Sequence, residues 1–124
     1  MKKWHNILGM AGVALVLALL GSCVHAAPDA PYITVKGNIS GGLGNYYCNV
    51  NISWEEVPGA DEYIIYYGYG LDPELFTRHS STRYNYAFHG YRIENPYDTG
   101  KIYHYAVKAS NIAGTSAFSN VVTW

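Results

Sequence analysis

Residues 103–116 read YHYAVKASNIAGTS, and this stretch decides the fold class. Apolar and aromatic residues occupy every second position, which places them on one face of an extended chain: Tyr103, Tyr105, Val107 and Ala109. An Asn- and Gly-containing turn follows, and then a short run through Val121 and Val122. The pattern predicts a half-buried strand, a turn and an edge strand.

The same alternation recurs upstream, between clusters of Gly, Pro, Asn and Ser. It predicts seven short strands at 32–36, 46–54, 63–69, 76–79, 83–88, 101–109 and 119–123, with loops at 37–44 and 55–62 and a strong turn at 95–100. No apolar period of 3.6 residues persists for three turns, so helix should be nearly absent. We expect one all-β domain over residues 27–124, built from two packed antiparallel sheets.

The clearest alternation lies in the segment 46–54, where the inward positions are Cys48, Val50, Ile52 and Trp54. In the segment 63–69, Tyr63, Ile65 and Tyr67 share one face, and Ile64 and Tyr66 the other. In the segment 83–88, Tyr84, Tyr86 and Phe88 fall on one face. After residue 26 Cys48 is the only cysteine, so no internal disulfide forms and a buried, inert thiol is expected.

Two segments resemble the fibronectin type III family. Trp54, followed by VPGADEYIIYY at 57–67, is similar to the family segment in which a core Trp closes the second strand and a Pro-Gly-Ala loop precedes a Tyr-rich strand. Residues 103–116 resemble the sixth strand and following loop of bacterial members. The resemblance covers 28–123 and implies a seven-stranded antiparallel Greek-key sandwich of the immunoglobulin-like class, with these structural positions: Trp54, Tyr63, Ile65, Tyr103 and Val107.

The resemblance also implies that Tyr103 is a tyrosine-corner residue whose hydroxyl bonds to backbone a few residues upstream. The segment 93–100 is longer and less regular than its family counterpart, so the partner of that hydroxyl stays open.

The first 26 residues are expected to be a signal peptide. Lys2 and Lys3 precede an apolar stretch, 7–20, that is short for a membrane span. Cleavage after Ala26 would leave a mature chain starting at Ala27. Alternatively, the LGSC sequence ending at Cys23 resembles a bacterial lipobox, in which Cys23 would be lipidated. Either route predicts an exported bacterial protein that is secreted, periplasmic or at the cell surface.

Charge and spacing argue against several chemistries. Without Lys2 and Lys3, six basic residues face nine acidic ones, a formal charge of −3 with no basic stripe for nucleic acid. His79, His89 and His104 lack zinc-ligand spacing and are expected to be solvated, the first two in loops. No calcium loop, nucleophile elbow or phosphate-binding loop is present in the sequence. We therefore expect a non-enzymatic protein without catalytic residues, metal or cofactor, and with membrane contact only through a lipid anchor at Cys23.

Thirteen tyrosines exceed what a small core needs. This favours a binding or adhesion module that recognises a protein or glycan at the cell surface, with a candidate site at Ile64, Tyr66, Tyr69 and His104. Outward aromatics also stabilise cross-strand pairs, which is the competing explanation. Two other functions stay open: a structural or assembly subunit of a surface complex, and a carbohydrate-binding accessory domain whose Tyr rings stack on sugars.

Overall fold

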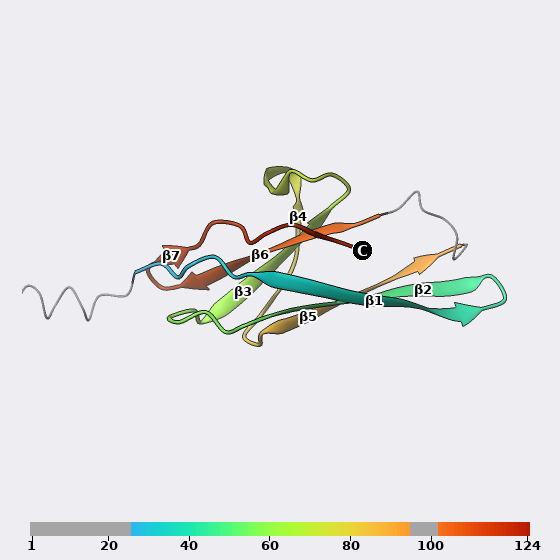
Figure 1. The fold of residues 1–124 in the computed structure, drawn as a ribbon, viewed down its shortest axis with the longest axis horizontal. Helices are drawn as coiled ribbons and strands as arrows, with labels where there is room; N and C mark the ends of the chain where they lie inside the picture. The colour runs from blue at the N-terminus through green and yellow to red at the C-terminus, as the bar shows by residue number, and fades with distance from the viewer. Residues whose placement is uncertain (1–25, 95–101) are drawn as a thin grey trace, which may run out of the picture.

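A computed structural model describes residues 26–94 and 102–124. Two antiparallel sheets pack face to face (Figure 1). The three-stranded sheet has the order β1-β2-β5, with β1 at Ile33–Gly42, β2 at Asn45–Trp54 and β5 at Tyr86–Ile93. The second sheet has the order β4-β3-β6-β7, and β8 also pairs with β6. Its strands are β3 (Glu62–Gly68), β4 (Thr77–Thr82), β6 (His104–Asn111), β7 (Gly114–Thr115) and β8 (Val122–Thr123).

The all-β antiparallel sandwich is confirmed, but its described part holds eight strands rather than seven. The expected strand at 119–123 is replaced by β7 and β8, because serine side chains interrupt the backbone ladder between them. The N–H groups of Ala109 and Val107 donate to Oγ of Ser116 and Ser119, at 2.9 and 2.8 Å. At these two points a serine hydroxyl accepts the hydrogen bond that a strand carbonyl would otherwise accept. The segment therefore runs beside β6 without regular strand pairing.

The predicted loop at 37–44 was wrong. β1 continues to Gly42 and forms a long hairpin with β2, as Figure 1 shows. The turn is Leu43–Gly44, and both residues have positive φ, 54° and 82°, as the tight two-residue hairpin turns of type I′ require. The Gly- and Asn-rich composition indicated a loop, but pairing with the strongly patterned β2 overrides local propensity.

The middle strands are displaced from their expected positions. The strand expected at 83–88 begins at Tyr86 and runs to Ile93, and the one expected at 76–79 spans 77–82. The only helix in the described residues is a 3₁₀ turn at Pro73–Leu75. The predicted turn at 95–100 lies outside the described residues.

The core lies between the sheets, and the inward positions predicted for β2 are buried, each at most 5% exposed. Trp54 meets the Tyr63 ring edge-on, with centroids 5.1 Å apart. The Tyr63 hydroxyl accepts a hydrogen bond from the Val57 N–H at 2.8 Å, which ties the loop after β2 to the core. The buried cluster consists of Ile33, Val50, Ile52, Trp54, Tyr63, Ile65, Tyr105, Val107 and Ala109.

Candidate binding surfaces

The predicted patch on β3 and β6 is partly covered by the chain itself. Ile64 and Tyr66 lie on the outer face of β3, opposite Lys108 and Ala106 of β6. The Tyr66 ring meets the Phe118 ring edge-on at 5.1 Å, and the Lys108 ammonium sits 4.0 Å above the Phe118 ring centre. These contacts leave Tyr66 half-buried, so much of its surface is already used in packing.

The other two predicted site residues lie apart from each other. His104 is on the outer face of β6 opposite Gly68, and its Nδ1 is 2.7 Å from Oγ1 of Thr123 on β8. Tyr69 instead stacks on Tyr103, with ring centroids 4.8 Å and hydroxyl oxygens 2.9 Å apart. Tyr103 packs against the core between the sheets, so Tyr69 does not extend the outer patch.

Between the sheets lies an aromatic cluster, formed around His89 by Tyr67, Tyr91, Tyr103 and Tyr105. The His89 ring stacks on Tyr67 at 5.0 Å, and its Nδ1 is 2.8 Å from the Tyr105 hydroxyl. The prediction that His79 and His89 occupy loops was wrong, because they lie on β4 and β5 with rings 4.7 Å apart. His79 is exposed, whereas His89 is half-buried.

The electrostatics of this cluster favour uncharged groups. Burial, and then the nearby His79, lower the pKa of His89 below 6.5. Burial, and then the hydrogen bond with Tyr69, raise the pKa of Tyr103 to about 12, and burial also raises the pKa of Tyr105. The buried Tyr105 hydroxyl therefore keeps its proton and forms a hydrogen bond with Nδ1 of a neutral His89, in which the tautomer of the ring sets the donor. Such a cluster packs the sandwich, and in the residues described no group of three His, Cys, Asp or Glu is placed to hold a metal ion.

The outer face of the three-stranded sheet carries several exposed aromatic side chains. Tyr84, Tyr86 and Phe88 are 64%, 59% and 56% exposed, and the first two rings stack at 5.6 Å with an interplanar angle of 17°. The sequence places these three residues on one face, but sequence reasoning did not propose that face as a site. The available signal was their alternation, together with the Asn and Ser residues at the outward positions of β2.

Strand register arranges this face in rows that run across β5, β2 and β1. We call it the aromatic face, and its rows are Tyr86–Ser53–Thr34, Phe88–Asn51–Lys36, Gly90–Asn49–Asn38 and Arg92–Tyr47–Ser40, with Tyr84 stacked on Tyr86. The Asn49 amide donates to Asn38 Oδ1 at 3.1 Å and to Ser40 Oγ at 2.9 Å. The face is therefore polar in its centre and aromatic along the edge strand β5.

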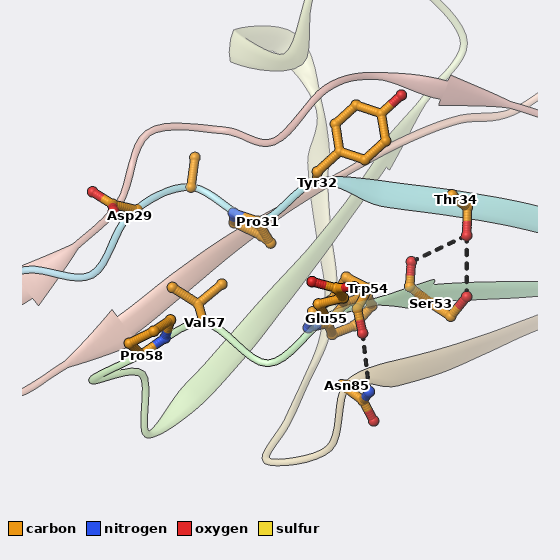
Figure 2. A pocket seen from close by; sticks show the side chains of 11 residues that line it. Asp29, Pro31, Tyr32, Thr34, Ser53, Trp54, Glu55, Val57, Pro58 and Asn85 are labelled. Carbon is orange, nitrogen blue, oxygen red and sulfur yellow. Dashed lines mark hydrogen bonds between the residues drawn. The ribbon is translucent and has the colours of Figure 1, made fainter.

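A groove adjoins one end of the aromatic face, and the two surfaces share Thr34 and Ser53. Its volume is about 790 Å³, and Figure 2 shows the side chains that line it. Trp54 lies at the floor with its carbonyl oxygen accepting from the Asn85 amide at 2.9 Å. The indole N–H of Trp54 is buried and has no hydrogen-bond partner among the described residues. The remaining lining residues are Asp29, Ala30, Pro31, Tyr32, Glu55, Val57 and Pro58.

Within 26–94 and 102–124, no helix has the length and apolar character needed to cross a membrane.

Comparison with known proteins shows a likeness in structure only. No family model matches the chain, and no curated protein matches it. An FN3tt variant is 21% identical with a TM-score of 0.51, over 80% of this chain and 96% of that one. Titin domains A168–A170 are 21% identical with a TM-score of 0.51. The match covers 79% of this chain and 32% of the titin chain. The twitchin kinase region of C. elegans is 20% identical with a TM-score of 0.53. The match covers 77% of this chain and 16% of the twitchin chain. This chain thus spans a third or less of the titin and twitchin chains, and the match concerns the fold.

Proposed function

We propose that this chain, which has the fibronectin type III fold, is an exported, non-enzymatic binding module whose partner docks on the aromatic face. The observation that carries the proposal is the exposure of Tyr84, Tyr86 and Phe88, each more than half open to solvent. Large aromatic side chains on a sheet surface expose apolar area that a partner would cover. Tyr in particular offers a large rigid contact with a polar tip.

The aromatic face supports binding better than the outer patch of Ile64, Tyr66 and His104. On that patch Tyr66 contacts Phe118, and His104 bonds to Thr123, so both side chains have partners within the chain. By contrast, the aromatic contact of Tyr86 is with Tyr84, itself 64% exposed, and both rings stay available. Phe88, two residues further along β5, continues the exposed aromatic edge in the next row.

Export is supported by the start of the fold. Pro28 and Pro31 are already buried, and the Ile33 N–H donates to Oδ1 of Asn120 at 2.7 Å. The packed domain thus begins directly after the predicted signal peptide, 1–26, as removal of that segment would require.

The test is affinity capture with the processed protein recovered from an expressing culture. The immobilised wild type, a Tyr86→Ala/Phe88→Ala double variant and Tyr66→Ala are each incubated with a cell-surface extract. Anchors at the centre of an interface typically contribute about 2 kcal/mol or more. The double variant should therefore weaken capture tenfold or more, while Tyr66→Ala retains it. Circular dichroism confirms that each variant is folded. Loss of capture only in Tyr66→Ala would refute the placement of the binding site on the aromatic face.

A further inference from the structure

We infer that the aromatic face binds an acidic polysaccharide, a chain of sugar rings that carry carboxylates. The inference rests on the proposed function and adds the chemical class of the partner. Three observations support it: the way the rings lie, the polar groups beside them and the sign of the charge.

The first observation is the arrangement of the exposed rings of Tyr84, Tyr86 and Phe88, which we call the platform. A Cβ atom placed on Gly90 would come within 2.9 Å of Cε1 and 3.0 Å of Cζ of Phe88. The Phe88 ring therefore lies over the backbone of Gly90, where only a glycine leaves room, while over half of the side chain stays exposed. Tyr84 and Tyr86, which precede Phe88 in the sequence, stack on each other with nearly parallel rings. The negative face of an aromatic ring attracts the weakly positive C–H groups that line a sugar ring.

The second observation is a row of uncharged hydrogen-bonding groups beside the platform. Ser53 and Asn51 of β2 lie directly opposite Tyr86 and Phe88, and both are exposed. An amide side chain offers two donors and one acceptor oxygen, and a hydroxyl offers both roles. Sugar hydroxyls also donate and accept, so a sugar stacked on the platform would meet complementary groups at its edge.

The third observation is charge. The rows of the aromatic face include Lys36 and Arg92 but no Asp or Glu, although acidic residues outnumber basic ones in the sequence by nine to eight. A further cation, Arg83, directly precedes the stacked tyrosines. The carboxylates next along the strands lie beyond the strand ends, with Glu55 after β2 and Glu94 after β5. Arg pairs with carboxylates through two parallel hydrogen bonds. The face therefore matches a carboxylated chain better than a neutral one.

Single-stranded nucleic acid also combines stacking with negative charge, but proteins that bind it line the backbone with a positive groove. On the aromatic face Lys36 and Arg92 lie in separate rows rather than along one groove, and the predicted export would place the domain among surface glycans. An oligonucleotide is therefore kept as a separate arm of the test.

The experiment is affinity electrophoresis of the processed protein in gels that contain polygalacturonate, hydroxyethyl cellulose or a thymidine oligonucleotide. We expect strong retardation by polygalacturonate that weakens with salt, and at least tenfold weaker retardation by the neutral polymer. Equal retardation by the neutral polymer, or stronger binding of the oligonucleotide, would overturn the inference.

Variants locate the site. Phe88→Ala should weaken binding of polygalacturonate tenfold or more, and Lys36→Gln/Arg92→Gln should remove most of its salt dependence. Gly90→Ala removes no aromatic group but makes the Phe88 ring shift, so it should weaken binding by less than Phe88→Ala does. Tyr66→Ala, on the other sheet, is the matched control and should bind like the wild type. Unchanged binding in both Phe88→Ala and Gly90→Ala would overturn the inference.

Failure of the inference is distinguishable from failure of the proposed function. If no polysaccharide binds but the Tyr86→Ala/Phe88→Ala variant loses a captured protein, the partner is a protein and the binding function stands. If neither polysaccharide binding nor capture depends on the aromatic face, both proposals fail. Sedimentation of the wild type identifies the remaining occupant, because a dimer broken by Phe88→Ala would show that a second copy covers this face.

Discussion

At the scale of single residues, His89 shows how burial changes the role of a side chain. On sequence grounds it is a solvated histidine, but in the structure its ring stacks on Tyr67 and its Nδ1 contacts the Tyr105 hydroxyl. A neutral imidazole fits this position, because Nδ1 can accept the hydroxyl proton. An imidazolium would carry a proton on both nitrogens, so Nδ1 would donate to the hydroxyl oxygen instead, and its charge would be disfavoured by burial and by the nearby His79.

The stability of the protein should therefore fall on mild acidification. The pKa of His89 lies below 6.5 in the folded protein and returns to about 6.5 on unfolding. Between these two pKa values the unfolded chain binds more protons, so the free energy of unfolding drops as the pH falls from about 6.5 toward the lowered pKa, and is unaffected by His89 above that window. Urea unfolding at a series of pH values measures the slope. His89→Gln should flatten this slope, and an unchanged slope in His89→Gln would contradict the assignment.

Trp54 tests the core. It is 5% exposed and packs on Tyr63, so Trp54→Ala should lower the free energy of unfolding by about 3–5 kcal/mol. Trp54→Phe should cost clearly less, because it keeps an aromatic ring and removes an indole N–H that has no partner. Urea denaturation followed by circular dichroism compares the variants. A loss below about 1 kcal/mol for Trp54→Ala would show that the Trp is not a central core residue.

At the scale of elements, the last part of the sandwich is held by side chains as well as by the ladder. Ser116 and Ser119 each bond to β6 twice, through the backbone N–H as donor and through Oγ as acceptor. The repeated arrangement explains why two short strands stand where one was expected. It also places Phe118, which lies between the serines, over the outer face of β3 and against Tyr66.

Loss of one of these hydroxyls should be costly. In Ser119→Ala the Val107 N–H stays buried without an acceptor, which typically costs about 1–3 kcal/mol. Ser110→Ala is the control, since its hydroxyl makes only an exposed contact of 3.4 Å with Thr115. Thermal and urea unfolding of both variants give the comparison. Equal stability of the two would mean that water replaces the lost acceptor.

At the scale of the whole molecule, the N-terminal end is joined to a distant loop. The Asn111 amide donates to the carbonyl oxygens of Ala26, at 2.7 Å, and Gly59, at 3.0 Å, while its Oδ1 accepts from the N–H groups of Ala113 and Gly114. Cleavage after Ala26 would remove one of these partners and keep the other three. Processing at Cys23 would keep all four.

We predict a mature chain that begins at Ala27 with a free amino group, because Ala27 is exposed, burial begins at Pro28, and Asn111 still holds Gly59 after the loss of its contact with Ala26. Intact-mass spectrometry of the protein from an expressing culture measures this directly. Cys23→Ser should leave the mass and the soluble fraction unchanged. Palmitate labelling, with recovery in the membrane fraction that Cys23→Ser abolishes, would instead establish the lipoprotein route.

Local pattern was enough to predict the sandwich and much of its core. In β2, β3 and β6 the inward positions follow from alternation alone, because the pleat sends successive side chains to opposite faces and burial selects the apolar set. Trp54, Tyr63 and Ile65 are buried where that alternation places them. The same logic put Tyr84, Tyr86 and Phe88 on one face.

Only the tertiary structure decided which of those faces is open. Phe118 covers Tyr66 from a segment about fifty residues away in sequence, and Gly90 makes room for the Phe88 ring. The extension of β1 to Gly42 and the contacts of His89 with Tyr67 and Tyr105 likewise depend on partners distant in the chain. Periodicity specifies the two sides of a strand, but exposure depends on what packs against each side, and that is settled when distant segments meet.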